Sequence, residues 1–366
     1  MFWAIPFLVC CAAGFVLFRA RTIPLPNVSA YHGAETDQRK LSVIIPARNE
    51  EENLPELLQS LKRQTRPPDE IIVVDDFSSD RTKEVAASFD GVTVLANEPL
   101  PPGWTGKNWA VWNGYAISRG DLIAFLDADV RLAPEALASL IAARDRTDGV
   151  VSVVPYHVTE RWHERLAFVT NILAVFAFMS RWEERNPRQG LYGSCILTTR
   201  EHYEAVKGHE SIKSEVLDDL SLGARYKQAG IPVTNYLGKG LVNFRMYAQG
   251  LRSGIEGFGK SAALSTATLH PVTIILNAVW IAGLLISEFG WLAIGTAWAL
   301  PLAIGYGLYM LQMIYLVKYI GRFGWAIVPL HLFSGIYFLV MMIYSAYQVM
   351  LLGRVKWKGR DVKTGG

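Results

Sequence analysis

Two aspartates, Asp127 and Asp129, stand one residue apart near the end of the apolar stretch LIAFLDADV, residues 122–130. The stretch is typical of a short buried strand that would carry both carboxylates at its end. Like charges held this close repel each other and shift each other's pKa. Mg²⁺ would neutralise them, because it prefers one or two carboxylates together with the phosphate oxygens of a substrate. For the pair taken alone, an Asp-rich turn after a strand is the plainer alternative.

Other apolar stretches also have the length and composition of buried strands. They cover residues 41–46, 70–74, 92–95, 149–155 and the end of 190–199. Their alternation with helical patterns predicts a parallel α/β sheet, in which ligands bind beyond the carboxyl ends of the strands. Arg48 and the pair Asp75–Asp76 follow two of these stretches. We therefore expect them to converge with Asp127 and Asp129 on one crevice.

Two predicted helices begin with charged residues. Lys107 follows a glycine-containing loop, and a lysine at a helix N-terminus can meet a diphosphate with help from free backbone N–H groups. A solvated surface lysine is an equally good interpretation of Lys107. Asp218 and Asp219 open a later helix, where the helix dipole already explains acidic residues in the first turn. For that pair in isolation, the dipole is a simpler explanation than catalysis.

The overall composition narrows the class of protein. A net charge of +3 and a pI of about 8.6 argue against dedicated nucleic-acid binding and are compatible with an anionic membrane surface. Two of the 3 cysteines are adjacent inside an apolar run, so no disulfide framework is indicated. This cysteine usage fits a reducing compartment for the soluble part of the chain.

Apolar segments at both ends predict a multi-pass protein of the inner membrane. Residues 1–20 read as an uncleaved anchor, because Arg19 and Arg21 follow the apolar core instead of preceding it, and residues 21–40 read as a linker. Uncharged stretches that exceed the length of a membrane span occupy much of residues 261–353. The uncharged run 166–180 is short for a span and indicates a buried or interfacial helix. The basic tail, residues 354–366, favours the cytoplasm, so we expect the α/β domain on the cytoplasmic side.

The number of crossings conflicts with the basic segments. The uncharged C-terminal stretches are residues 261–287, 289–317 and 325–353. The short loop 318–322 and the basic tail both favour the cytoplasm, which is impossible if the stretch between them crosses once. Pro329 and Gly335 could break that stretch into a re-entrant hairpin. We therefore give the basic tail more weight than the segment count.

Four segments taken in chain order resemble family 2 glycosyltransferases of the GT-A fold. They are IIPARNEEENL, IIVVDDFSSDRT, TGKNWAVWNGYAISRGDLIAFLDAD and LDDLSLGARYKQAG. The resemblance covers about residues 41–260 and implies a Rossmann-like α/β domain with a mostly parallel sheet, attached to transmembrane helices. PLPPGWTGKNWA, RMY and GFGK are similar to segments of bacterial membrane enzymes that glycosylate carotenoid acids or hopanoids.

This resemblance implies a UDP-sugar donor and a Mg²⁺ or Mn²⁺ cofactor. The implied nucleotide-sugar contacts are Pro46, Ala47, Arg48, Glu50, Asp76, Lys107, Asn113 and Asp127. Among them, Asp76 would face the uracil or ribose, Lys107 the nucleotide or its phosphates, and Asp127 the ribose or metal-bound water. Asp129 would bind the metal on the diphosphate.

It also implies how a lipid acceptor is activated. Asp219 would be the general base, although the Asp218–Asp219 pair replaces a more common Glu-Asp pair and leaves open which carboxylate acts. Arg245, Tyr247 and Lys260 would lie on the acceptor or phosphate side. No Q-x-x-R-W element is found, which favours a single sugar transfer over polymer synthesis. One displacement would invert the anomeric centre. A carboxylic acid acceptor would already be ionised near pH 7, so that Asp219 would mainly orient it.

Two alternatives remain. A polyprenyl-phosphate sugar transferase would need basic residues near the membrane, and Arg245, Arg252 and Lys260 could serve there. A non-catalytic membrane protein could retain the fold as a binding module. That interpretation predicts no change of phenotype when Asp129 and Asp219 become asparagine. The sequence does not choose among sugars, because one missing contact shifts selectivity by only about 1–3 kcal/mol.

Overall fold

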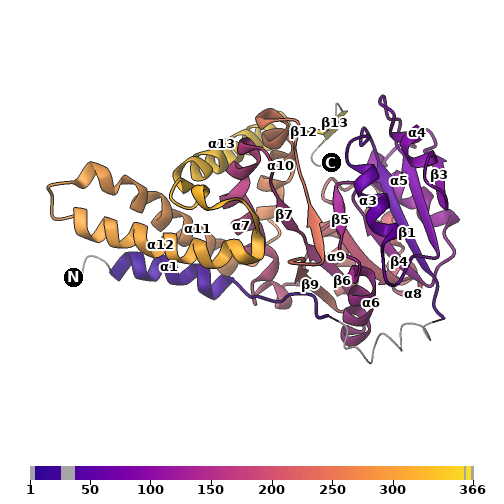
Figure 1. Ribbon diagram of the computed structural model, residues 1–366, viewed down its shortest axis with the longest axis horizontal. Helices are drawn as coiled ribbons and strands as arrows, with labels where there is room; N and C mark the ends of the chain where they lie inside the picture. The colour runs from indigo at the N-terminus through magenta and orange to yellow at the C-terminus, as the bar shows by residue number, and fades with distance from the viewer. Residues whose placement is uncertain (1–4, 26–37, 358–359, 364–366) are drawn as a thin grey trace.

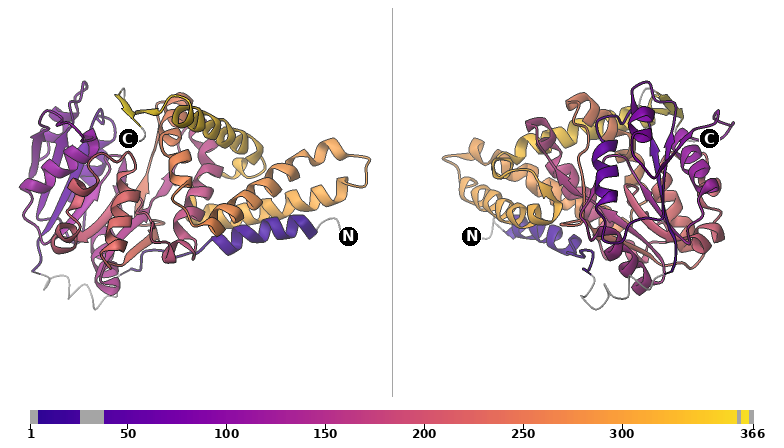
Figure 2. Two further views of the ribbon diagram at one scale, coloured as in Figure 1. Left: turned by 180° about the vertical axis from the view of Figure 1, so that it is seen from behind. Right: turned by 45° about the vertical axis from the view of Figure 1, so that its right-hand side comes forward.

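The computed structural model describes residues 5–25, 38–357 and 360–363, and the side chains of Lys260, Ser261, Ala263, Trp291 and residues 354–363 lie outside this description. Figure 1 shows an α/β part beside a bundle of long helices. The long helices extend away from the strands, and the three views agree on this elongated shape (Figure 2).

A seven-stranded sheet, in the order β3-β2-β1-β4-β8-β6-β9, organises the α/β part. The strands are β1 (Leu41–Ala47), β2 (Glu70–Asp75), β3 (Val92–Ala96), β4 (Leu122–Leu126), β6 (Val150–Val154), β8 (Cys195–Thr199) and β9 (Val233–Leu237). β8 runs antiparallel to both of its neighbours, whereas the other pairs are parallel. The expected mostly parallel sheet is confirmed, with one reversed strand.

Helices cover both faces of this sheet, because successive side chains of a strand point to opposite sides. Val43 and Ile45 of β1 pack in the same core as the leucines of α3 (Leu54–Lys62), whereas Ile44 packs with Val111 of α5 (Gly106–Ile117). The remaining helices of the α/β part are α4 (Thr82–Ala87), α6 (Ala136–Thr147), α8 (Arg200–Ala205) and α9 (Asp218–Gln228), with η2 (Trp162–Ala167), η3 (Glu183–Arg185) and η4 (Gly208–Ile212).

A second, four-stranded sheet connects the α/β part to the helical bundle. Its order is β11 (Gly321–Arg322), β7 (Tyr156–Val158), β10 (Val242–Phe244) and β5 (Val130–Leu132). The apolar stretch 122–130 is therefore not one strand, because β4 ends at Leu126 and Val130 begins β5 in the other sheet. Asp127 and Asp129 occupy the turn that joins the two sheets.

Three helices in the described part are long and apolar enough to cross a membrane, namely α11 (Pro271–Glu288), α12 (Ala299–Ile320) and α13 (His331–Met350). α1 (Ile5–Leu17) is shorter and lies alongside α11 and α12 (Figures 1 and 2). Gln312 of α12 joins α1 and α11 by two hydrogen bonds. Its side chain donates to the carbonyl of Cys11 at 2.8 Å and accepts from Trp280 at 2.7 Å. The first predicted C-terminal span, residues 261–287, begins only at Pro271 in the structure, since residues 261–266 belong to α10 (Leu251–Thr266).

The expected interfacial helix is α7 (Phe168–Met179), and one of its faces is buried against the bundle. The other described elements are η5 (Phe289–Ala293), η6 (Trp325–Ile327), β12 (Arg354–Trp357) and β13 (Arg360–Lys363). The last predicted span, residues 325–353, lies close to the α/β part at both of its ends. α12 ends at β11, which pairs with β7, and Ser345 of α13 donates to a backbone carbonyl of α10.

The segment between these points runs outward, because His331 at the start of α13 contacts Glu288 at the end of α11, with 2.5 Å between Nε2 and Oε1. Pro329 lies in the outward segment, and α13 runs back as one continuous helix through Gly335. The chain thus runs outward before α13 and returns along it, and whether this segment is re-entrant in a membrane stays a prediction. Gly335, however, does not break the chain.

Candidate active site

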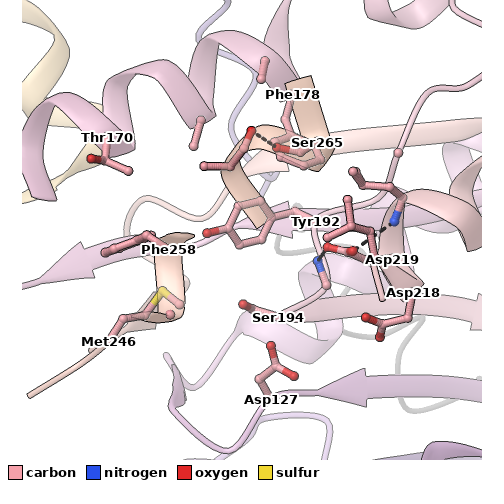
Figure 3. Close-up of a pocket in the computed structure, with 18 of the residues that line it drawn as sticks. Asp127, Thr170, Phe178, Tyr192, Ser194, Asp218, Asp219, Met246, Phe258 and Ser265 are labelled. Atoms are coloured by element: carbon pink, nitrogen blue, oxygen red, sulfur yellow. Dashed lines mark hydrogen bonds between the residues drawn. The ribbon is translucent and has the colours of Figure 1, made fainter. Parts of the chain in front are cut away.

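One cavity of about 1010 Å³ extends from the sheet to the helical bundle. The part of it that we call the sheet half is lined by Pro46, Ala47, Arg48, Glu50, Asp76, Lys107, Asp127, Asp129, Asp218 and Asp219. The helix half is lined by α7, α10, α11 and α13, through Thr170, Leu173, Ala177, Phe178, Phe258, Asn277, Ala278, Ile281, Phe338 and Met341 among others. Figure 3 shows three of the aspartates at one side, Phe258 and Thr170 at the other, and Tyr192 between them.

Lys107 lies between carboxylates in the sheet half. Its Nζ is 3.1 Å from Oδ1 of Asp127 and 3.4 Å from Oδ2 of Asp218. Burial would lower the pKa of Lys107, but Asp127, Asp218 and Asp219 together outweigh burial and raise it above its usual range. Lys107 is therefore a fixed positive charge at the start of α5, and the interpretation as a solvated surface lysine is wrong.

The two carboxylates at the start of α9 have different surroundings. Asp218 faces Lys107, whereas Oδ2 of Asp219 accepts a hydrogen bond from the backbone N–H of Gly193 at 3.0 Å. Oδ1 of Asp219 accepts from the N–H of Leu220 at 3.0 Å. A Cβ on residue 193 would lie about 3 Å from the Asp219 carboxylate, so glycine allows this close approach. The geometry separates a carboxylate bound to lysine from one held by backbone amides.

Asn108 joins the Lys107 helix to the segment that leads into α9. Its side chain is fully buried, and its amide nitrogen donates to the carbonyl of Ile212 at 2.8 Å. The backbone N–H of Thr105 donates to the carbonyl of Lys213 at 2.8 Å. These bonds fix the start of α5 against the segment before Asp218, which sets the position of Lys107 relative to the acidic pair.

A polar network lies beyond the ends of β2 and β3. Asn97 donates to Oδ1 of Asp76 at 2.9 Å, and Oδ1 of Asn97 accepts from Asn113 at 2.7 Å. Arg48 donates to the backbone carbonyl of Asp76 at 2.8 Å. Asp76 and Arg48 line the cavity, whereas Asn113 is absent from the lining and contacts Asn97. The sequence analysis missed Asn97, although its place directly after a predicted strand was the same signal that identified Asp76.

The residues expected on the acceptor side lie in different places. Tyr247 lines the cavity, and its backbone φ of 57° is left-handed, a conformation that is costly for an aromatic residue and concentrates at functional sites. Arg245 is absent from the lining and forms ion pairs with Glu160 at 2.7 Å and Glu164 at 2.8 Å. Lys260 lies in α10, and its side chain lies outside the described part of the structure.

Tyr192, which the sequence analysis missed, separates the two halves. It lines the cavity, and its ring packs against Phe178 of α7 at 5.1 Å between centroids. Burial, and then Asp129, Asp219 and Asp127, raise the pKa of Tyr192 well above its usual range. Its hydroxyl is therefore a neutral hydrogen-bonding group beside the carboxylates. No local sequence pattern identifies it, because it stands in a loop before β8.

The sheet half fits a divalent cation that also binds a substrate. Asp127, Asp218 and Asp219 act on Lys107. With Asp76 and Asp129, the aspartates that line the sheet half outnumber its two cations, Lys107 and Arg48, which leaves the region with excess negative charge. No group of three or more His, Cys, Asp or Glu side chains in a metal-binding arrangement occurs among the described residues. Mg²⁺ commonly takes one or two carboxylates and completes its coordination with phosphate oxygens and water. The donor set at Asp127 and Asp129 therefore suits a metal that arrives with a diphosphate.

Comparison with known proteins identifies the family. The model of glycosyl transferase family 2 matches residues 42–206. The 4,4'-diaponeurosporenoate glycosyltransferase of Staphylococcus aureus strain USA300 is 32% identical over 338 residues, which cover 89% of this chain and 88% of the relative. The chain belongs to glycosyl transferase family 2. This confirms the resemblance found in its sequence motifs.

One solved structure supports the fold of this family 2 glycosyltransferase. The mannosyltransferase PcManGT from Pyrobaculum calidifontis, in complex with GDP-Man and Mn²⁺, is 16% identical with a TM-score of 0.50, covering 95% of this chain and 99% of that chain. Glucosyl-3-phosphoglycerate synthase from Mycobacterium tuberculosis, in complex with Mn²⁺, UDP and glucosyl-3-phosphoglycerate, is 22% identical over 61% of this chain and 75% of that chain, with a TM-score of 0.42. The expected GT-A fold is confirmed.

In this family 2 glycosyltransferase, the family match ends at residue 206, before the acidic pair of α9 and before most of the helix half. The matched segment thus contains most of the residues that line the sheet half, together with α7. The residues that line the helix half come from α7 and from three helices beyond the match.

Proposed function

We propose that the protein transfers one sugar from a UDP-sugar to a lipid acceptor, such as a carotenoid acid, a hopanoid or a similar lipid, with inversion at the anomeric carbon. The observation that carries the proposal is one cavity that joins a charged sheet half to a mainly apolar helix half, which is lined in part by the candidate membrane helices α11 and α13. The relative named for 4,4'-diaponeurosporenoate supports a lipid-like acceptor, since the similarity extends over 89% of this chain and 88% of the relative.

The sheet half would bind the UDP-sugar. Asp76, fixed by Asn97, would accept a hydrogen bond from the uracil or ribose, and Asp127 would contact the ribose. Lys107, held positive by its carboxylate neighbours, would attract the diphosphate. Asp129 would hold Mg²⁺ or Mn²⁺, and a metal bound there would neutralise the negative charge that develops on the leaving UDP.

Asp219 would accept the proton of an acceptor hydroxyl as the hydroxyl attacks the sugar. Asp218 is less suited to this task, because its carboxylate lies 3.4 Å from the Lys107 ammonium. The amides of Gly193 and Leu220 orient Asp219 for proton transfer. A carboxylate acceptor needs no base, and Asp219 would then only orient it. One displacement from the face opposite to UDP inverts the anomeric centre.

A polyprenyl-phosphate acceptor is the second candidate. The observation that favours it is the presence of Arg188 and Arg252 in the cavity lining, where they could meet a lipid phosphate. Arg245, which was considered for the same role, is already paired with two glutamates. Arg252 also forms an ion pair, with Glu256 at 2.9 Å, so the cationic character of this region is partly offset.

The test uses the full-length protein in nanodiscs with Mg²⁺ or Mn²⁺. Labelled UDP-glucose and UDP-N-acetylglucosamine, with GDP-mannose for comparison, are each supplied with a carotenoid acid, a hopanoid alcohol or undecaprenyl phosphate. We expect a labelled lipid product of inverted configuration, and UDP release that depends on the acceptor. Intact nucleotide sugar with every combination would contradict the proposal. Transfer only to undecaprenyl phosphate would establish the second candidate.

The proposed location is the inner membrane, with the α/β part in the cytoplasm. Arg19 and Arg21, which follow α1, both lie 2.6 Å from Glu184 of the α/β part. Positively charged residues next to membrane helices favour the cytoplasmic side. Labelling of single cysteines with an impermeant maleimide in intact and opened cells tests this orientation. Maleimide labelling of an Asp148→Cys variant in intact cells would contradict it.

A further inference from the structure

Thr170 places a buried hydroxyl in the helix half of the cavity. The residue is only 9% exposed and lines the cavity, and its Oγ1 has no hydrogen-bond partner among the described residues. A helical threonine usually bonds to the carbonyl four residues earlier. Here that carbonyl, of Leu166, accepts from Oγ of Ser334 at 2.7 Å. Because Oγ1 has no partner among the described residues, the hydroxyl of Thr170 is available to a ligand.

Asn277 offers a second polar group in the same chamber. It lies on α11, and its Oδ1 is buried without a hydrogen-bond partner among the residues that the structure describes. Its neighbours in the cavity lining on α11 are apolar, namely Ile274, Ala278 and Ile281. A buried polar atom in apolar surroundings is unfavourable unless it is hydrogen-bonded.

The two groups stand at different depths. α7 and α11 run antiparallel, since Ser180 lies 3.2 Å from Thr273 and the ring of Phe176 lies 5.3 Å from that of Trp280. Asn277 is therefore level with the last turns of α7, near the end that contacts Tyr192. Thr170 lies roughly 10 Å farther along α7, at the 1.5 Å rise of a helical residue. Figure 3 shows Thr170 on the side of the cavity away from the aspartates.

From these positions we infer that the acceptor is an oxygenated lipid, with hydroxyl or carbonyl groups in its apolar body in addition to the end that receives the sugar. This inference rests on the proposed function. A purely hydrocarbon body would fill the helix half but leave Thr170 and Asn277 unsatisfied. Water is a poor substitute at Asn277, because a buried water needs two to four polar partners and the residues of α11 that line the cavity beside Asn277 are apolar. Thr170 and Asn277 would thus determine specificity without touching the reacting atoms.

The test measures kcat/KM for matched acceptors with the full-length protein in nanodiscs. The acceptors are a long-chain parent lipid and a series in which one hydroxyl is moved stepwise along the chain. We expect the wild type to prefer hydroxyls at two positions by about tenfold or more over the parent. Thr170→Val should remove the preference for the position farther from the reacting end, and Asn277→Leu the preference for the nearer one. Thr170→Ser keeps the hydroxyl and should retain both.

Equal kcat/KM for all acceptors, or an equal loss for the parent and the hydroxylated lipids in Thr170→Val, would overturn the inference. Complete lack of transfer from any UDP-sugar would instead refute the proposed function. The inference then still has an independent readout, because a bound ligand raises the unfolding midpoint. The preferred hydroxylated lipid should raise the midpoint of the wild type more than the parent does. The same shift in Thr170→Val would contradict the inference.

Discussion

The two halves of the cavity are built in different ways. The sheet half presents charged side chains from the ends of β1, β2 and β4 and from the first turns of α5 and α9. The helix half presents mainly apolar side chains from α7 and from three helices much later in the sequence, α10, α11 and α13. Charged groups are thus held by short, rigid connections to the sheet, whereas the apolar wall results from helix packing. The difference suits a polar donor that needs exact positioning and a lipid acceptor that needs mainly a matching shape.

If this division is correct, the largest effect should follow a change in the sheet half. Asp129→Asn keeps the size of the side chain but removes the charge expected to bind the metal, so we predict a loss of at least about 10³-fold in kcat/KM. Metal-dependent binding of UDP should be lost as well, which calorimetry can measure. Asp148→Asn is the matched control, because Asp148 is 90% exposed in its side chain and is absent from the cavity lining. Unchanged UDP binding in Asp129→Asn would show that Asp129 is not a metal ligand.

The next largest effect should be confined to the acceptor. Ala278→Trp would fill part of the helix half, and we predict a rise of roughly 10- to 100-fold in KM for the lipid, in line with the loss of a few kcal/mol of apolar contact. Donor binding should be unchanged. The control is Ile275→Trp on the same helix, since Ile275 is 60% exposed and is absent from the cavity lining. A similar rise in the control would mean that the helix half does not bind the acceptor.

A smaller effect should follow when the connection between the start of α5, which carries Lys107, and the segment before Asp218 is weakened. Asn108→Ala removes the hydrogen bonds to the segment before α9, and we predict a fall of about tenfold in kcat with little change in donor KM, because Lys107 and the acidic pair lose their fixed spacing. The control is Tyr115→Phe, because Tyr115 lies on α5 like Asn108 and the change removes a 2.7 Å hydrogen bond to Glu204 of α8. Equal falls in both variants would indicate a general loss of stability.

The smallest effect at working pH should appear in the acid stability. Burial lowers the pKa of His209 to about 4 from its ordinary 6.5. Between these values the unfolded chain binds a proton that the folded protein does not, so stability is complete above pH 6.5 and falls as the pH drops toward 4. His209→Gln should make this fall shallower, as measured by unfolding midpoints in detergent. An identical pH dependence in wild type and variant would contradict the assignment.

Much of the sheet half could be predicted from the sequence. Asp76, Asp127 and Asp129 follow strands, and Lys107 and Asp219 open helices, so local patterns and the rule for parallel sheets were enough to bring them together. The pattern did not show that Lys107 is paired with two carboxylates, because that contact depends on how α5 packs against α9. It also did not show that Arg245 is occupied by glutamates from another segment.

The helix half was predicted only as a set of apolar helices. Thr170, Asn277 and Met341 belong to segments whose relative positions depend on tertiary packing, and hydrophobic periodicity cannot specify which face lines a cavity. A re-entrant path before α13 was predicted from the basic segments alone. Its position relative to a membrane stays a prediction. Tyr192, in a loop between the halves, had no signal in the sequence.

The central claim is that donor and acceptor meet in one cavity between the sheet and the membrane helices. The most direct test is photo-crosslinking of a diazirine-bearing lipid acceptor to the full-length protein, with and without UDP and Mn²⁺, followed by mass spectrometry. The account predicts adducts at residues of the helix half, such as Phe338 and Met341, and competition by an unlabelled acceptor. Adducts found instead on the outer surface of α12, for example at the 67% exposed Leu311, with no competition would contradict it.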